Sequence, residues 1–134
     1  LGGQDMFDNN VFKKDSLKNR VVDGQTVGFE LETFITYYRA IPLSMVNYIA
    51  IKVDGQEVPR EAITCSPNGQ DWFTLDEMET VTTYKWEYNV PLKIRVAQEG
   101  GLSSGEHEVE LTVETRTAYI PVPIHGVNTR KVVI

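Results

Sequence analysis

Apolar side chains recur at every second position over much of this chain, and this alternation restricts its fold more than any other feature. In residues 27–38 the apolar set is Val27, Phe29, Leu31, Ile35 and Tyr37, with mostly glutamate and threonine on the opposite side. A period of two places one set of side chains on a single face of an extended strand. Similar runs occupy residues 45–53, 80–88, 92–97, 106–116 and 131–134. The sequence therefore predicts strands along most of its length.

Turn signals separate these runs. Asp23-Gly24 and Asp54-Gly55 supply the positive φ angles that tight hairpins need. The other turn signals are Pro67-Asn68-Gly69, Gly100-Gly101 and Ser104-Gly105. One helical turn is possible where Thr74 and Glu77 have the spacing of a capping box, and a plain loop is the alternative.

Many short strands with regular turns are typical of an antiparallel sandwich or barrel. We predict an all-β, single-domain antiparallel β-sandwich with at most one short helical turn. The 134 residues suffice for one core, and no linker or repeat divides them. Residues 1–5 precede Met6, and we expect them to be a remnant of cloning, with residues 6–134 forming the domain.

Composition excludes some classes of function. The net charge is −6, and no stripe of Lys and Arg offsets it, so we expect no nucleic-acid binding. No apolar run approaches the roughly 18 residues that cross a bilayer, so we expect no membrane insertion. Cys65 is the single cysteine, which rules out an internal disulfide and fits a reducing compartment.

The chain offers few residues for chemistry. His107, His125 and Cys65 are far apart in the sequence and lack the spacing of a metal motif, so we predict no metal site. Cys65 could be a nucleophile if His125 approached it, although free cysteines are more often inert and buried.

Three carboxylates lie close together at Asp76, Glu77 and Glu79. Paired carboxylates can act as acid and base in sugar hydrolysis, but a solvated turn followed by the polar face of the next strand is the favoured interpretation. We therefore predict no catalytic residue in this chain.

Two connections between strands are unusually apolar. Both fit a protein interface, since interfaces are enriched in Tyr, Arg and Met. The alternative is a connection that folds over its own core. The prolines at 121 and 123 exclude a central strand there. The candidate interface residues are Tyr37, Tyr38, Arg39, Ile41, Pro42, Leu43, Met45, Tyr119, Pro121 and Pro123.

Four segments carry a family resemblance: "GFELETFITYYRAIPLSMV", "VDGQEVPRE", "FTLDEMETVTTYKWE" and "GGLSSGEHEVELTV". Together they resemble the small beta subunit of bacterial C-glycoside deglycosidases, from Met6 onward. The resemblance implies a cytoplasmic bacterial β-sandwich subunit bound to a TIM-barrel alpha subunit. That partner is expected to hold a divalent metal ion, which we expect to be manganese.

The resemblance also implies a reaction, namely cleavage of the carbon–carbon bond between sugar and aglycone in 3-oxo-C-glycosides such as oxidised flavonoid C-glucosides. No catalytic residue is transferred to this chain, because those of the family belong to the alpha subunit. The alternative is a stand-alone carbohydrate-binding or adhesion module in which Trp72, Trp86 or the Tyr37–Tyr38 pair stacks on sugar rings.

Overall fold

The computed structural model describes residues 11–34, 41–86, 90–117 and 120–134, and for residues 47, 116–117 and 120–125 it describes the backbone only. Strands dominate these ranges, which confirms the predicted all-β fold. The strands are β1 (Lys18–Val22), β2 (Gln25–Thr33), β3 (Ile41–Pro42), β4 (Val46–Val53), β5 (Gln56–Glu57), β6 (Ile63–Ser66), β7 (Phe73–Thr74), β8 (Lys85–Trp86), β9 (Leu92–Ala97), β10 (Glu106–Thr117) and β11 (Ile120–Val133). The helical turns are η1 (Leu43–Met45), η2 (Arg60–Ala62) and α2 (Leu75–Met78).

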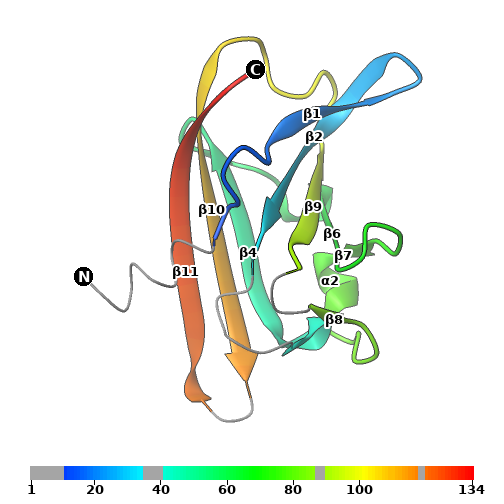
Figure 1. The fold of residues 1–134 in the computed structure, drawn as a ribbon, viewed down its shortest axis with the longest axis vertical. Coiled ribbons are helices and arrows are strands. Elements are labelled where there is room, and N and C mark those ends of the chain that lie inside the picture. Colours follow the sequence, from blue (N-terminus) through cyan, green and yellow to red (C-terminus); the bar gives the residue numbers. More distant parts are fainter. Residues whose placement is uncertain (1–10, 35–40, 87–89, 118–119) are drawn as a thin grey trace.

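Two antiparallel sheets pack face to face as a sandwich (Figure 1). The larger sheet has the strand order β1-β2-β9-β6-β7, and the other has the order β11-β10-β4-β5. A third, short sheet joins β3 to β8 at the end of the sandwich drawn at the bottom of the figure. The predicted sandwich architecture is confirmed.

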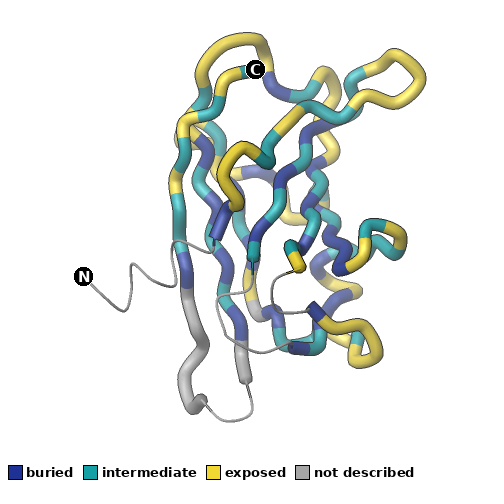
Figure 2. The backbone as a smooth tube through the Cα atoms, in the orientation of Figure 1, coloured by how far each residue is buried: buried dark blue, intermediate teal, exposed yellow. Residues whose placement is uncertain are grey.

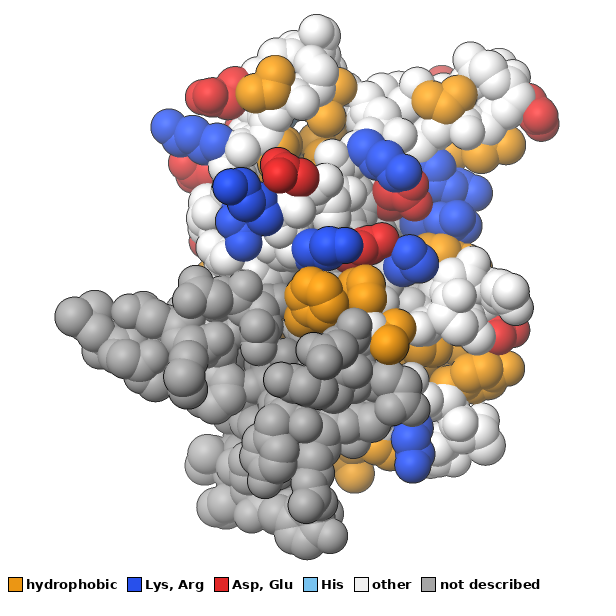
Figure 3. Space-filling view, viewed as in Figure 1, with side chains coloured by type: hydrophobic (Ala, Val, Ile, Leu, Met, Phe, Trp, Pro, Cys, Tyr) orange, Lys and Arg blue, Asp and Glu red, His pale blue; other side chains and the backbone are white. Residues whose placement is uncertain are grey.

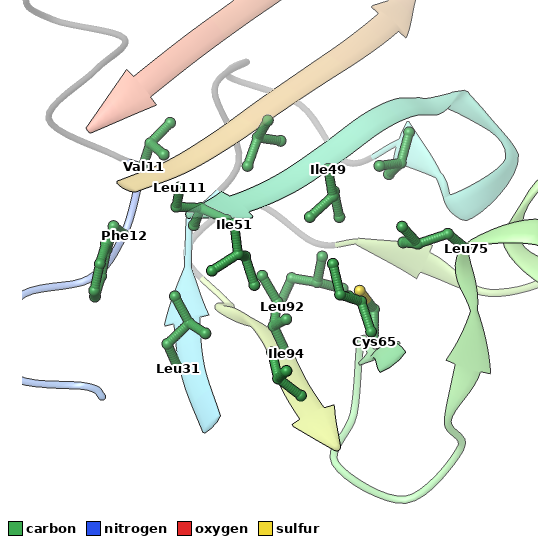
Figure 4. Packing of buried hydrophobic residues seen from close by; sticks show 14 of the residues in the cluster. Val11, Phe12, Leu31, Ile49, Ile51, Cys65, Leu75, Leu92, Ile94 and Leu111 are labelled. Carbon is green, nitrogen blue, oxygen red and sulfur yellow. The ribbon is translucent and has the colours of Figure 1, made fainter. Parts of the chain in front are cut away.

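The core lies between the two main sheets. In β9 the buried Leu92, Ile94 and Val96 alternate with outward-facing neighbours, as the period of two predicts. Ile51 and Leu111 of the opposite sheet are 0% exposed and close the core from the other side (Figure 4). Each such side chain contributes about 1.5–3 kcal/mol by leaving water. The sandwich is therefore held mainly by side chains that alternate along its long strands.

Both Asp-Gly turns form hairpins as predicted. Asp23 and Gly24 join β1 to β2 with φ values of 51° and 79°, and Asp54 and Gly55 join β4 to β5 with 51° and 84°. Two consecutive residues with positive φ give a turn whose twist matches that of the flanking strands.

The capping box at the start of α2 is present. The Glu77 N–H donates to Thr74 Oγ1 at 3.2 Å, and the Thr74 N–H donates to Glu77 Oε1 at 2.7 Å. These reciprocal bonds satisfy backbone donors that a helix start leaves unpaired. Of the two interpretations of this segment, the helical turn is confirmed.

The predicted strand over residues 80–88 is mostly wrong within the described range. β8 contains only Lys85 and Trp86, while residues 80–84 form no strand. The Thr80 and Val81 N–H groups continue the hydrogen bonding of α2, to the carbonyls of Glu77 and Met78. The continuation of α2 at its C-terminal end therefore overrides the β propensity of these residues.

The proline-containing connection is also different from its prediction. Residues 120–133 form one continuous strand, β11, in place of an apolar loop followed by a short strand at 131–134. Among the described strands, β11 lies at an edge of its sheet and pairs only with β10. An edge strand tolerates Pro121 and Pro123, because a proline lacks only the donor that would pair a second neighbour.

An N-terminal strap, residues 11–16, closes the sandwich at the edge formed by β1 and β11. The start of the strap is coloured as buried in Figure 2. Val11 and Phe12 are 0% exposed. The Lys13 N–H donates to the Glu32 carbonyl at 2.7 Å, which attaches the strap to β2. Asn128 Nδ2 donates to the Val11 carbonyl at 3.0 Å, which attaches it to β11. The strap therefore bridges the two sheets.

Candidate functional site

His107 is held between two acceptors. Its Nδ1 lies 2.7 Å from Asp54 Oδ2, and its Nε2 lies 2.7 Å from the Ser103 carbonyl oxygen. The imidazolium form can donate from both ring nitrogens at once, so the two contacts favour that form. The hydrogen bond to Asp54 accordingly raises the pKa of His107, and the same bond lowers the pKa of Asp54.

This arrangement does not provide a catalytic base. Ser103 Oγ lies 3.3 Å from His107 Nε2, which superficially resembles part of a serine triad. A triad needs Nε2 to accept a proton from the serine, whereas here that nitrogen donates to a carbonyl. His107 and Asp54 line a hollow of about 480 Å³, but the ring has no free nitrogen to offer a ligand or metal. The cluster instead links the β4–β5 turn to the β9–β10 loop.

Cys65 is in the core. It is 0% exposed, and burial raises the pKa of its thiol to about 12. It projects among apolar side chains (Figure 4). Its backbone lies in β6 of the larger sheet, while that of His125 lies in β11 of the other sheet. A thiol with this pKa stays protonated at neutral pH, which favours the inert interpretation of Cys65.

The acidic cluster has structural partners. Asp76 Oδ1 lies 2.6 Å from Arg60 Nη2, and Glu79 Oε1 lies 3.7 Å from the same atom. Glu77 caps α2. The arrangement is that of a surface turn, in agreement with the favoured interpretation.

No metal site is formed by the described part of the chain. There, no group of three His, Cys, Asp or Glu side chains could hold a metal ion. Over the same ranges, no helix combines the length and apolar character needed to cross a bilayer.

The predicted interface residues divide into three groups. Ile41 and Leu43 are 3% and 0% exposed, so their side chains belong to this chain's own core. Pro42 and Met45 are partly exposed. The remainder are not described, or are described by backbone alone: Tyr37, Tyr38, Arg39 and Tyr119 lie outside the described residues, and the side chains of Pro121 and Pro123 are not described.

Backbone bonds hold this connection against the neighbouring segment. The Leu43 N–H donates to the Tyr84 carbonyl at 3.1 Å, and the Ser44 N–H donates to the Val81 carbonyl at 2.9 Å. Tyr84 is 36% exposed and packs its ring against Phe73, with centroids 5.3 Å apart. An exposed aromatic therefore accompanies Pro42 and Met45, a neighbour that the sequence alone did not reveal.

The two tryptophans are poorly placed for stacking on sugars. Trp86 is 0% exposed. The guanidinium carbon of Arg95 lies 3.8 Å from the centroid of the Trp72 ring and covers one of its faces. These positions weigh against the carbohydrate-binding alternative, so far as it depends on Trp72 and Trp86.

Sequence reasoning missed the partners of His107. The sequence identifies Asp54 only as part of a hairpin turn and indicates no role for Ser103. Asp54 lies 53 residues from His107, and no local motif connects them. Asp54 follows β4 and His107 lies at the start of β10. Their proximity could be inferred only once the pairing of β4 with β10 is known.

Comparison with known families decides the classification. Residues 7–119 match the family model described as C-glycoside deglycosidase beta subunit. The chain belongs to this family. The family resemblance predicted from the sequence is thereby confirmed.

Two relatives of this beta-subunit family member cover most of its length. The C-glycoside deglycosidase beta subunit of Eubacterium cellulosolvens is 29% identical over 99 residues, which are 74% of this chain and 67% of the relative. The 3'-dehydrocarminate deglycosidase beta subunit of a Microbacterium species is 29% identical over 119 residues, 87% of this chain and 83% of the relative. Both relatives are named as one subunit of a larger protein.

Proposed function

We propose that this chain is the noncatalytic beta subunit of a heteromeric C-glycoside deglycosidase. The observation that carries the proposal is the family match over residues 7–119, and both relatives are named as beta subunits. The described side chains support a noncatalytic role. His107 is hydrogen-bonded to Asp54, Cys65 is buried with a raised pKa, and Asp76 of the acidic cluster forms an ion pair with Arg60.

The substrate of the complex, in this proposal, is a 3-oxo-C-glycoside such as an oxidised flavonoid C-glucoside, produced by a separate oxidising enzyme. The 3-oxo group acidifies the proton on C2, so a base can remove it and form an enolate. The enolate then expels the aryl carbon, which breaks the carbon–carbon bond and leaves a double bond between C1 and C2 of the sugar. The phenolic ring takes up a proton at the released carbon. The name of the Microbacterium relative, which refers to a dehydro compound, supports an oxidised substrate.

A divalent metal ion, proposed to be manganese, would stabilise the enolate as a Lewis acid. The described residues of this chain do not fit such an ion, since no three candidate ligands converge. We therefore assign the metal and the base to a TIM-barrel alpha subunit and route no step of the reaction through this chain.

The proposed contribution of this chain is to cover the mouth of the partner's barrel. Barrel active sites are built from loops at one end, and a second subunit over them excludes water from the reaction. The proposed contact includes Pro42, Met45 and the exposed Tyr84. Tyr37, Tyr38 and Arg39 are proposed to extend it. The complex would act in the bacterial cytoplasm.

Co-expression tests this proposal. The partner would be sought as an adjacent reading frame that encodes a barrel of about 250 residues or more. We expect the two chains to co-elute in size-exclusion chromatography and to cleave a 3-oxo-C-glucoside together, whereas the purified single chain should be inactive with or without added manganese. Turnover by the rigorously purified single chain would overturn the noncatalytic assignment. Failure of the two chains to associate would overturn the proposed complex.

A further inference from the structure

A cavity of about 520 Å³ opens at the edge of the sandwich where the N-terminal strap meets the end of β11. Its lining comes from two segments far apart in the sequence: Lys14, Asp15 and Leu17 from the strap and its continuation, and Thr129, Arg130, Lys131, Val132 and Val133 from β11.

The lining carries an excess of positive charge. The lining contains three basic side chains, Lys14, Arg130 and Lys131, and one carboxylate, Asp15. The net charge of the whole protein is −6. Within the described ranges, none of these three cations has a carboxylate at ion-pair distance. A concave cationic site on an acidic protein concentrates anions locally.

The adjacent outer face of the larger sheet is different. There four basic side chains have acidic partners, and acidic and basic side chains lie next to one another on the face drawn in Figure 3. Arg20 of β1 has no ion pair within the described residues. The pairs are Lys18–Glu30 and Arg95–Glu30, each at 3.7 Å, Lys13–Glu32 at 3.4 Å and Lys93–Glu32 at 2.9 Å. The positive charge at the cavity is therefore not a general property of this side of the protein.

Arg130 is already fixed in position. Its Nε–H donates to the Phe12 carbonyl at 2.6 Å, and its guanidinium carbon lies 5.8 Å from the centroid of the Phe12 ring. A guanidinium has five N–H donors, and this bond uses the one on Nε. The donors on the two Nη atoms make no hydrogen bond within the described residues. A side chain that is ordered before binding loses less entropy when a ligand arrives.

We propose that this cavity binds an oxyanion, either a phosphate or a carboxylate group. Arg130 supplies a fixed fork of paired donors, a geometry suited to bidentate contact with two oxygens of such a group. Lys14 and Lys131 are exposed residues of the lining and add positive charge near the mouth of the cavity. The inference rests on the geometry of this edge and is independent of the function proposed above.

The test is an NMR titration of the full chain at pH 7 with sodium phosphate and, separately, with sodium acetate. Sodium chloride at matched ionic strength gives the baseline. We expect saturable shifts of the backbone amides of residues 14–17 and 129–133 with phosphate, acetate or both, and the stronger of the two identifies the preferred oxyanion. Absence of saturation with both anions, or equal shifts with chloride, would overturn the proposal.

A charge-matched pair of variants separates a site from general electrostatics. Lys14→Gln with Lys131→Gln should weaken binding about tenfold or more, because each removes a charged donor. Lys52→Gln with Lys85→Gln makes the same change in net charge at exposed lysines that do not line the cavity, and should alter affinity by less than about twofold. Equal weakening in both double variants would refute a defined site.

Discussion

Replacing Leu43 with alanine tests whether the 41–46 connection belongs to this chain's core. The Leu43 side chain is 0% exposed, and its backbone bond to the Tyr84 carbonyl does not depend on the side chain. The free energy of unfolding therefore falls by the transfer free energy of the removed carbons plus the cost of the cavity that they leave. For a buried Leu→Ala substitution this amounts to about 2–5 kcal/mol. Because η1 is a single turn near the end of the sandwich, some collapse is expected, and we take about 3 kcal/mol. For a domain of this size that loss lowers Tm by about 10 °C.

Urea unfolding of the isolated chain, followed by tryptophan fluorescence, measures this loss. Met45→Ala is the matched control, because Met45 lies in the same turn but is only partly buried, so we expect a loss of about 1 kcal/mol. If Leu43→Ala changed the unfolding free energy by less than about 0.5 kcal/mol yet prevented assembly with the partner, the burial argument would be refuted.

Leu43→Asp gives the same contrast more sharply. An interface role for Leu43 requires an unchanged midpoint in the isolated chain, whereas its burial predicts that a carboxylate there strongly destabilises the fold.

The remaining predictions concern Cys65 and His107, two of the groups with shifted pKa values. Cys65 should resist a thiol reagent in the folded chain and react after unfolding, and Cys65→Ser should cost about 1–3 kcal/mol by burying a hydroxyl while leaving the activity of the complex within a few-fold of wild type. Rapid labelling of the folded protein would contradict the burial of the thiol. The raised pKa of His107 means that its stabilising contribution is complete below about pH 6.5 and is lost as pH rises through the folded-state pKa. Between pH 6 and 9, the unfolding free energy of wild type should therefore fall relative to that of His107→Gln. Asp54, whose pKa is lowered by the hydrogen bond from His107, stays ionised over this range. A constant difference between the two proteins would show that the imidazolium is not required.

Local patterns predicted the parts of this fold that depend on neighbouring residues. The alternation in β2, β9 and β10 identified the buried faces, since a strand has a period of two whatever its partners are. The Asp-Gly hairpins and the capping box were equally accessible, because each is decided within four residues.

The errors arose where distant segments compete. Residues 80–84 have β-branched and aromatic side chains, but α2 and the connection at Leu43 take up their backbone groups. The prolines at 121 and 123 correctly excluded a central strand, but the apolar character of their segment suggested a loop, whereas it belongs to an edge strand.

The chemistry of single residues was equally dependent on contacts across the fold. His107 gave no indication in the sequence that its ring would be fixed by Asp54 and Ser103. The cavity lined by Lys14 and Lys131 brings together residues from nearly opposite ends of the chain. No spacing rule reaches across such distances, so this part of the candidate site required the structure.

The N-terminal strap has a consequence for how the chain is made. Its bonds to β11 join residues separated by 117 and 118 positions, from Asn128 to Val11 and from Arg130 to Phe12. During synthesis, Val11 and Phe12 leave the ribosome more than 100 residues before Asn128 and Arg130, so their carbonyls must wait for these partners. Contacts between such distant positions carry a high loop-closure entropy and tend to form late. Until then the side chains of Val11 and Phe12 remain exposed to solvent. A nascent or truncated chain that lacks β11 would therefore expose this apolar segment to chaperones and to other unfolded chains.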